Sequence, residues 1–158
     1  KIEEHRVHVG YFGSFYENRG VGDVVKAITA LPEDLRQVVR LHIFCPNPEK
    51  AQAQLWALGA PEQVMVNAAL PYLEFLNLAQ KFDALLVNDT DVSGTDFAVN
   101  PFLPSKFADY SGAGVPIWGI LTKDSPLSKQ QMRYRSGAGD FSSVVSALRT
   151  IIETGMSQ

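Results

Sequence analysis

Apolar segments of strand length alternate with segments of helical periodicity along most of this 158-residue chain. β-branched and aromatic residues mark six predicted strands, at residues 5–12, 38–45, 64–66, 84–87, 115–120 and 132–136. The fourth of these is apolar at every position, which is typical of a strand that helices cover on both faces. Strands that alternate with helices in this way predict an α/β fold, a Rossmann-like three-layer sandwich with a parallel sheet of about six strands.

Helices are predicted between these strands and after the last one. Their expected bounds are residues 21–31, 49–58, 71–81, from Pro104 to the glycines at 112 and 114, and 141–154. Apolar residues recur at helical spacing in the first helix, at Val21, Val24, Val25, Ile28 and Leu31, and in the last helix, at Val144, Val145, Leu148, Ile151 and Ile152. Pro32 is expected to end the first helix, and Asp140 is expected to cap the last.

The composition fits one globular domain over residues 1–158. Hydrophobic residues make up 46% of the chain and charged residues 20%, which suits a buried core. The formal net charge of −3 argues against a general nucleic-acid partner. Cys45 is the single cysteine, and its apolar strand predicts a buried, inert thiol. No apolar run reaches the ~18 residues of a membrane span. Because the sequence begins at Lys1, we expect it to be a piece of a longer chain.

The link after the first predicted strand carries glycines at both ends and one arginine. It reads G-S-F-Y-E-N-R-G-V-G over residues 13–22. The dinucleotide fingerprint G-x-G-x-x-G is not present, although Gly10 and Gly13 are three residues apart. One interpretation is a tight turn with Arg19 on the surface. The other is a loop whose backbone approaches a ligand while Arg19 reaches phosphate oxygens. The residues alone leave both interpretations open.

The segment 100–120 predicts a helix whose first turn suits an anion. Pro104 fits the first helical position, because its missing N–H would be unpaired there in any case. Ser105 and Lys106 follow in the first turn, where free N–H groups and the helix dipole favour negative charge. Asp109 lies one turn further, about 5.4 Å along the axis, on the face of Lys106. This pairing fits a nucleotide, with diphosphate at the helix start and ribose on the carboxylate. The alternative is an ordinary solvated helix face.

A polar loop at residues 88–100 follows the fourth predicted strand. Its three aspartates, Asp89, Asp91 and Asp96, lack the calcium-loop pattern with its terminal glutamate, so we expect no metal site. Ligands of parallel sheets bind beyond the carboxyl ends of the strands. We therefore expect this loop to line a ligand, together with the turn after the first strand and the helix start at Pro104.

Two segments resemble the donor-binding domain of group 1 glycosyltransferases, which have the two-Rossmann-domain GT-B architecture. The first is G-Y-F-G-S-F-Y-E-N-R-G-V-G-D-V-V-K-A-I, where a strand and a glycine turn lead to a basic residue, a glycine and a helix. The second is P-S-K-F-A-D-Y-S-G-A-G-V-P-I, in which Asp109, Gly114 and Pro116 keep the spacing of the family's later signature. The resemblance extends from about His5 to Ile152 and implies the C-terminal half of such an enzyme.

The resemblance implies a role for each candidate site residue. Asp109 matches the carboxylate that binds the ribose hydroxyls of the nucleotide sugar. Arg19 and Lys106 match the basic, catalytic positions beside the diphosphate, where Ser105 also lies, and Gly13 matches the turn that faces the cleft. In this family the reaction needs no metal and no cofactor. A uridine or guanosine base would lie against the link before the predicted helix at 71–81.

Two departures from the family pattern bear on these roles. Pro101 stands where the family carries a second acidic residue that touches the donor sugar, and Asp96 or Asn100 would have to replace it. Asn100 is therefore a further candidate for nucleotide-sugar binding. The second departure is size, because the acceptor-binding N-terminal domain lies outside this sequence. We expect this piece alone to bind nucleotide weakly and to transfer nothing.

The implied function is transfer of a sugar from a nucleotide sugar to a glycan, lipid or polysaccharide precursor. The implied location is the cytoplasm, with contact to the inner membrane face through the absent domain. One alternative is a sugar-nucleotide epimerase of the same architecture, which would release a changed sugar without an acceptor. Another is a non-catalytic α/β nucleotide-binding or interaction domain, and Pro101 in place of an acid is its best support.

Overall fold

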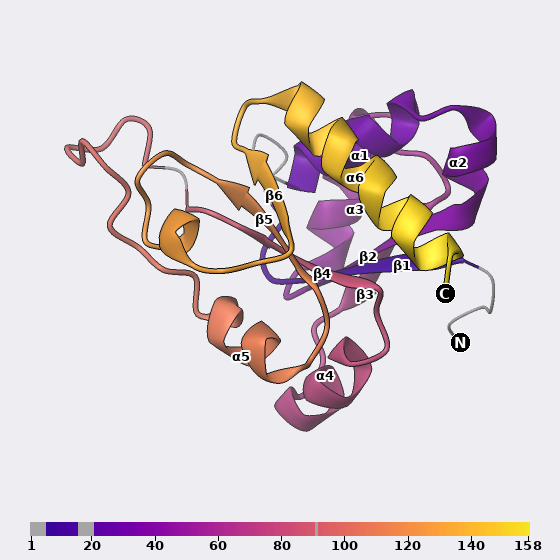
Figure 1. Ribbon diagram of the computed structural model, residues 1–158, viewed down its shortest axis with the longest axis horizontal. Helices are drawn as coiled ribbons and strands as arrows, with labels where there is room; N and C mark the ends of the chain where they lie inside the picture. Colours follow the sequence, from indigo (N-terminus) through magenta and orange to yellow (C-terminus); the bar gives the residue numbers. More distant parts are fainter. Residues whose placement is uncertain (1–5, 16–20, 91) are drawn as a thin grey trace.

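A computed structural model describes residues 6–15, 21–90 and 92–158. Within these residues six parallel strands form one sheet, in the order β3-β2-β1-β4-β5-β6 (Figure 1). The strands are β1 Val7–Phe12, β2 Val39–Cys45, β3 Val64–Ala68, β4 Ala84–Asn88, β5 Ile117–Leu121 and β6 Tyr134–Gly137. The strand order reverses between β1 and β4, which is where sheets of this kind open a ligand crevice.

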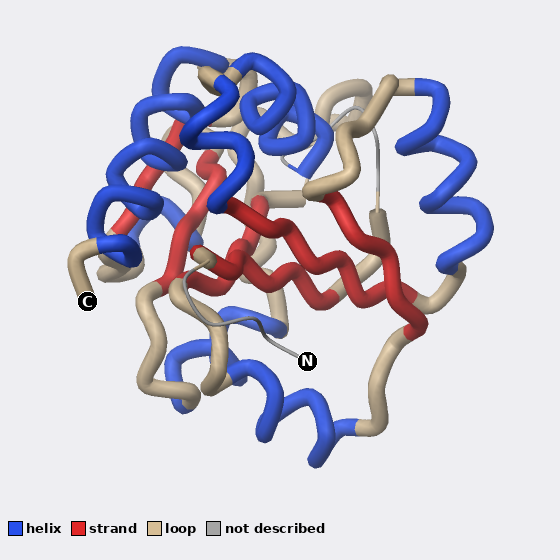
Figure 2. Tube along the Cα trace, turned by 90° about the vertical axis from the view of Figure 1, so that its right-hand side faces the viewer, coloured by secondary structure: helices blue, strands red, loops and turns tan. Residues whose placement is uncertain are grey.

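The helices form a layer on each face of the sheet, as Figures 1 and 2 show from two sides. On one face lie α1 Val21–Ala30, α2 Glu33–Val38, α3 Pro48–Ala57 and α6 Phe141–Met156. On the other lie α4 Tyr72–Ala79 and α5 Lys106–Gly112, and the β5–β6 link contains the short 3-10 helix η1 Leu127–Lys129. The predicted Rossmann-like three-layer sandwich is therefore confirmed.

The face covered by α1 and α6, the α1–α6 face, buries mostly aliphatic side chains. The stripes predicted in these two helices pack there, including Ile28 and Leu148, each 0% exposed. Trp118 of β5 is also fully buried, and its Nε1 donates a hydrogen bond of 2.8 Å to Ser136 Oγ on β6. Asp140 caps α6 as predicted, because its side chain accepts a hydrogen bond from Ser143 N.

The opposite α4–α5 face buries a cluster of aromatic rings. Phe12 of β1 stacks on Phe44 of β2 at 4.7 Å between ring centroids, and Phe75 of α4 meets Phe12 edge-on at the same distance. A Cβ at Gly10 would lie 2.9 Å from the Phe82 ring, so only glycine fits against that ring without movement. This cluster binds α4 and α5 to the middle of the sheet.

Two histidines lie on neighbouring strands on the α4–α5 face, His8 near the start of β1 and His42 in the middle of β2. His8 is 3% exposed, and its Nδ1 lies 2.8 Å from Nε2 of His42 on the neighbouring strand, so the two rings share one hydrogen bond. Burial lowers the pKa of His42 to about 4, and repulsion from His8 and Arg40 acts in the same direction. The His42 ring is therefore neutral in the folded protein at neutral pH.

The structure corrects the expected ends of several elements. Helix α5 begins at Lys106, two residues after the expected start, because Pro104 is still outside the helix and Ser105 is its N-cap. The helix runs through Gly112 and ends where Gly114 takes a left-handed φ of 71°. Helix α2 was not predicted, because its six residues are too few to display helical periodicity. Cys45 is buried as predicted, and burial raises its pKa.

Candidate functional site

A cleft of about 520 Å³ opens at the carboxyl ends of β1 and β4, the point where the strand order reverses. Three segments line it, from the end of β1, the end of β4 and the start of α5. The lining residues are Tyr11, Phe12, Gly13, Ser14, Leu86, Val87, Asn88, Asp89, Thr90, Phe102, Leu103, Pro104, Ser105, Lys106 and Tyr110. The cleft lies where the sequence predicts a ligand, and it contains three of the candidate site residues.

The turn after β1 brings backbone groups to the cleft. Gly13 N donates a hydrogen bond of 2.9 Å to Phe44 O, and the Tyr11 hydroxyl donates one of 2.7 Å to Ser14 O. A side chain at Gly13 would meet the Tyr11 hydroxyl, since an added Cβ lies 3.3 Å from it. Gly13 thus lines the cleft with bare backbone, as expected. Arg19, the other candidate in this link, lies outside the described residues.

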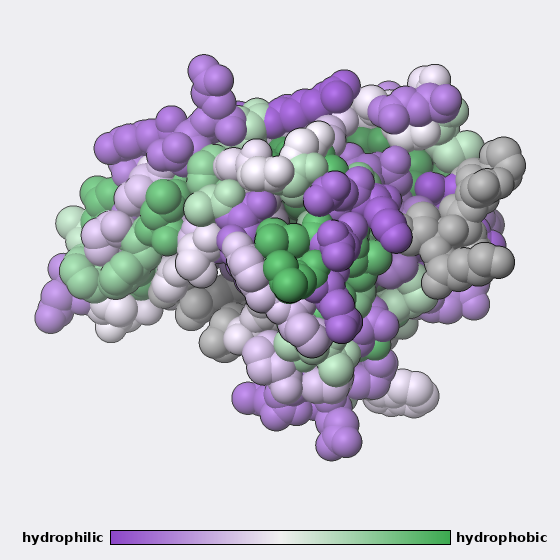
Figure 3. Space-filling model, turned by 90° about the horizontal axis from the view of Figure 1, so that it is seen from below, coloured by the Kyte–Doolittle hydropathy of each residue, from purple (hydrophilic) through white to green (hydrophobic). Residues whose placement is uncertain are grey.

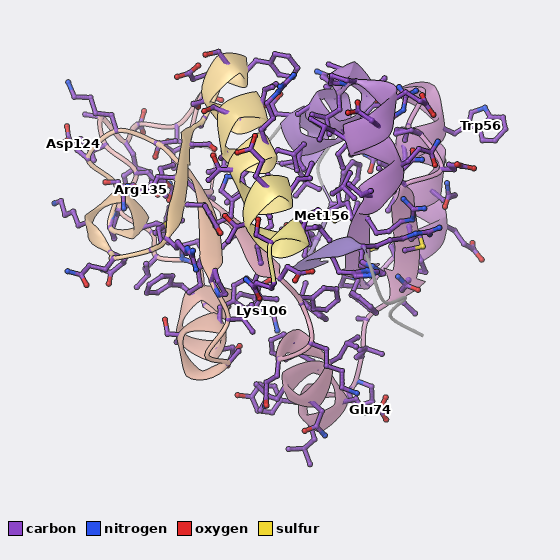
Figure 4. All side chains as sticks on the ribbon, turned by 45° about the vertical axis from the view of Figure 1, so that its right-hand side comes forward. Trp56, Glu74, Lys106, Asp124, Arg135 and Met156 are labelled. Atoms are coloured by element: carbon purple, nitrogen blue, oxygen red, sulfur yellow. The ribbon has the colours of Figure 1, made fainter. Side chains whose placement is uncertain are left out.

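The start of α5 forms the opposite wall of the cleft. Ser105 and Lys106 both line it, and the Ser105 side chain makes no capping hydrogen bond. Lys106 projects from α5 toward α4 (Figure 4). Its Nζ lies 4.1 Å from the centroid of the Phe75 ring and 3.8 Å from Asp109 Oδ2. The Lys106 ammonium group, on the cleft wall, therefore lies between the Phe75 ring and the Asp109 carboxylate.

Asp109 lies beside the cleft rather than in its lining. Its Oδ2 faces Lys106, and its Oδ1 accepts a hydrogen bond of 2.9 Å from the Tyr72 hydroxyl of α4. The predicted pairing of Lys106 and Asp109 on one face of the helix is therefore present in the structure. Tyr72 was not expected in this pairing, because no sequence spacing relates it to a residue 37 positions later.

Asn100 holds the β4–α5 loop in shape and does not line the cleft. It is 2% exposed, its Nδ2 donates to Thr90 O at 2.6 Å, and its Oδ1 accepts from Phe102 N at 2.9 Å. Both ends of the amide are thus engaged by the backbone of its own loop. Asp96, the other residue considered for the donor sugar, also lies outside the cleft lining, on an exposed part of this loop.

Asp89 belongs to the loop that the sequence predicts to line a ligand, and it does line the cleft. Its carboxylate is 5% exposed, and Oδ2 accepts hydrogen bonds from Thr122 N at 2.7 Å, Thr122 Oγ1 at 3.2 Å and Ser125 Oγ at 2.7 Å. Oδ1 has no hydrogen-bond partner in the described structure. Asp89 therefore ties the loop after β5 to the end of β4, beside the cleft. A signal was available, because Asp89 comes two positions after the wholly apolar run at residues 84–87.

Tyr110 joins α5 to β1 under the cleft. It is 1% exposed, and its hydroxyl accepts a hydrogen bond of 3.1 Å from Phe12 N at the end of β1. Burial raises the pKa of its phenol well above the ordinary value, so the group stays neutral. The cleft wall at Lys106 and the turn at Gly13 are thus fixed to one another through this ring.

The mouth of the cleft is apolar on one side. The loop between β4 and α5 exposes four large apolar side chains, each about half exposed, at Phe97, Val99, Phe102 and Leu103. Figure 3 shows green apolar atoms at the left end of the molecule, where this loop lies in Figure 1. Phe102 and Leu103 belong both to this exposed set and to the cleft lining.

No group of three or more histidine, cysteine, aspartate or glutamate side chains is placed to hold a metal within the described residues. Across the same residues, no helix has the length and apolar character that crossing a membrane requires.

Several solved structures with a similar fold are glycosyltransferases. No family model and no curated protein matches the sequence. The fold matches WaaG, a glycosyltransferase involved in lipopolysaccharide biosynthesis, with a TM-score of 0.64 and 17% identity over 99% of this chain and 41% of that one. It matches the lipopolysaccharide outer core galactosyltransferase WaaB with a TM-score of 0.66 and 18% identity, over 98% of this chain and 43% of that one.

A third match is Anabaena Alr3699/HepE, solved in complex with UDP-glucose, with a TM-score of 0.65 and 13% identity over 96% of this chain and 43% of that one. The present chain spans about two fifths of the length of each of these three proteins. Such partial coverage is consistent with the C-terminal domain that the sequence resemblance implies. This chain has the fold of one Rossmann-like domain of the GT-B glycosyltransferases.

Proposed function

We propose that this chain is the nucleotide-sugar-binding domain of a glycosyltransferase. The observation that carries the proposal is the cleft at the β1–β4 switch point, with Lys106 on its wall and Asp109 one helical turn further along the same face. The cation suits the diphosphate of a nucleoside diphosphate, and the carboxylate suits its ribose. The similarity of fold to glycosyltransferases supports the same substrate class.

The diphosphate would lie between the turn at Gly13 and the start of α5. Bare backbone at Gly13 allows close approach, and Ser105 adds a hydroxyl that makes no capping bond. Lys106 would supply the charge, moving from Asp109 to a phosphate oxygen. A hydrogen bond between charged groups contributes roughly 1.5–3 kcal/mol, so Lys106 is the residue on which affinity depends most.

The ribose would lie toward α4, where Asp109 offers its carboxylate. An ionised carboxylate accepts hydrogen bonds at about four lone-pair positions, which suits the two neighbouring hydroxyls of a ribose. The base would then lie against the link between β3 and α4. The donor sugar would occupy the part of the cleft beside Asp89 and the β4–α5 loop.

In sugar transfer, Lys106 would stabilise the negative charge that develops on the departing diphosphate, with Arg19 as a second cation. Such preorganised charge stabilisation is usually the largest single contribution to catalysis, and here it would require neither metal nor cofactor. The acceptor would be held by a further domain in the whole protein, since this chain spans about two fifths of its structural neighbours. A cytoplasmic location, with membrane contact made by that domain, belongs to the same proposal.

The proposal is tested by an NMR titration of this chain with UDP and, separately, with GDP. We expect one of them to shift the amide signals of Gly13, Ser105, Lys106 and Asp109 at millimolar concentration, because these residues surround the predicted diphosphate and ribose positions. The amides of α6 on the opposite face serve as the internal control. Absence of shifts at the cleft with both nucleotides, or equal shifts on α6, would contradict the proposal.

A further inference from the structure

Asp109 has a neighbour from another helix that fixes how its carboxylate is turned. Tyr72 is the first residue of α4, and its hydroxyl donates a hydrogen bond of 2.9 Å to Asp109 Oδ1 on α5. The other oxygen, Oδ2, lies 3.8 Å from Lys106 Nζ. Each carboxylate oxygen therefore has a different partner, a phenol on one side and an ammonium group on the other.

Both partners lie near the same aromatic ring. The Tyr72 ring lies 6.0 Å from the Phe75 ring, and Lys106 Nζ lies 4.1 Å from the centroid of the same Phe75 ring. Phe75 is 2% exposed and belongs to the aromatic cluster of the α4–α5 face. Tyr72 and Lys106 thus both lie beside the buried Phe75 ring, on the side from which they reach Asp109.

The hydrogen bond between Tyr72 and Asp109 is not one that buried polar groups need for want of water. Tyr72 is 58% exposed and the Asp109 side chain is 23% exposed, so water would satisfy both groups if they separated. Exposed polar pairs of this kind add little to folding stability, because protein and water hydrogen bonds exchange at similar free energy. A conformational role for the bond follows more naturally than a stabilising one.

The conformational role concerns the torsion of the carboxylate. The terminal torsion of an aspartate is broad, so an unrestrained carboxylate samples many orientations. The hydrogen bond to Asp109, followed by the charge of Asp109, raises the pKa of Tyr72, so its phenol stays protonated and remains a donor at neutral pH. Tyr72 occupies one of about four acceptor positions of the carboxylate and leaves the others open to a ligand.

We propose that Tyr72 is a positioning residue that orients Asp109 to accept the hydroxyls of a ribose and so to favour ribonucleotides over 2′-deoxyribonucleotides. This inference rests on the proposed function, because it requires nucleotide binding with the ribose at Asp109. When Lys106 turns to a phosphate, the bond from Tyr72 keeps the carboxylate in the orientation seen here. Two hydroxyl donors then replace Lys106 at Oδ2.

The test compares affinities for a ribonucleotide and its deoxy counterpart, measured by calorimetry with this chain. The probes are UDP and 2′-deoxy-UDP, or GDP and 2′-deoxy-GDP if only the guanosine form binds. We expect the unmodified chain to prefer the ribonucleotide about tenfold, since a hydroxyl bonded to a carboxylate is lost in the deoxy form. Tyr72→Phe keeps the ring and removes the donor, and should reduce this preference to about threefold or less.

Two further variants serve as controls, one that should abolish the preference for ribose and one that should leave it unchanged. Asp109→Asn should abolish the preference, because the carboxylate itself is removed. Leu73→Ala is the control on the next residue of α4, where a 72% exposed side chain without a hydrogen-bond donor is shortened. It should leave the preference unchanged. A merely structural bond between α4 and α5 would lower the melting temperature of Tyr72→Phe and leave its preference at the unmodified value.

The outcomes separate the two proposals. If the unmodified chain binds neither UDP nor GDP, the proposed function is wrong and this inference falls with it. If it binds a nucleotide but shows no preference for ribose, or if Tyr72→Phe keeps the full preference, the role of Tyr72 is wrong while the proposed function stands. A preference reduced in Tyr72→Phe, absent in Asp109→Asn and kept in Leu73→Ala supports the inference.

Discussion

The α1–α6 face of the sheet packs mainly aliphatic side chains, whereas the α4–α5 face packs aromatic rings beside the candidate cleft. On the first face α1 and α6 lie against each other and present apolar stripes. On the second face α4 and α5 are short, and their polar residues Tyr72, Lys106 and Asp109 contact one another at the surface. We infer that the first face supplies most of the stability and the second carries ligand recognition.

The largest effect is expected from a cavity on the α1–α6 face. Leu148→Ala removes a side chain that is 0% exposed in the middle of α6, so we expect the free energy of unfolding to fall by about 2–5 kcal/mol. Urea denaturation measures this loss. Nucleotide affinity of the folded variant, measured well below its melting temperature, should remain as in the unmodified chain. A weakened affinity would show that this face also shapes the cleft.

Tyr110→Phe should affect both stability and binding. The change removes the acceptor of Phe12 N and leaves a buried N–H unpaired, which costs about 1–3 kcal/mol. Because Phe12 precedes the turn at Gly13, we also expect weaker nucleotide binding. Urea denaturation and calorimetry give the two quantities. Stability loss without any change of affinity would mean that the turn does not depend on this hydrogen bond.

Acid should destabilise the protein through His42. Its pKa is about 4 in the folded protein and about 6.5 in a model peptide. The unfolded chain therefore binds the proton first, and the free energy of unfolding decreases as the pH falls from about 6.5 to about 4. We expect the melting temperature to drop over this range, and to drop less in His42→Asn. Equal acid sensitivity of the two proteins would assign the effect to other groups.

The smallest loss of stability is expected from Asp89→Asn, which forms a matched pair with Asp89→Ala. Asp89→Ala leaves the donors at Thr122 and Ser125 without their acceptor, with a loss of about 1–3 kcal/mol. Asp89→Asn keeps one oxygen for these donors and places the amide nitrogen where Oδ1 has no partner, so the loss should stay below about 1 kcal/mol. Thermal unfolding compares the two. Equal losses would show that the negative charge, rather than the hydrogen bonds, holds this loop.

The difference between the faces also explains how far the sequence could predict the structure. Residues such as Val24, Ile28 and Leu148 repeat at helical spacing, so α1 and α6 were predicted closely, whereas the short α2 on the same face was missed. Gly13, Ser105 and Lys106 were expected at the cleft because the carboxyl ends of parallel strands meet at one edge. Contacts that join distant segments could not be predicted this way.

Tyr72 and Asp109 show the limit most clearly. They lie on different helices, which meet where Phe75 of α4 lies beside Tyr110 of α5 in the aromatic cluster. The same holds for Asp89, whose partners lie after the next strand in the sheet. Asn100 was named for its polarity and its place near a motif, but its amide is engaged by its own loop.

The central claim is that Lys106 binds the diphosphate of a nucleotide in the cleft. The most direct measurement is the dissociation constant of UDP, or of GDP if only that form binds, for the unmodified chain and for Lys106→Ala, with Lys26→Ala as the control on the exposed side of α1. We predict at least about tenfold weaker binding for Lys106→Ala, unchanged binding for Lys26→Ala, and melting temperatures of both variants close to that of the unmodified chain. Equal affinity of Lys106→Ala and the unmodified chain would contradict the account.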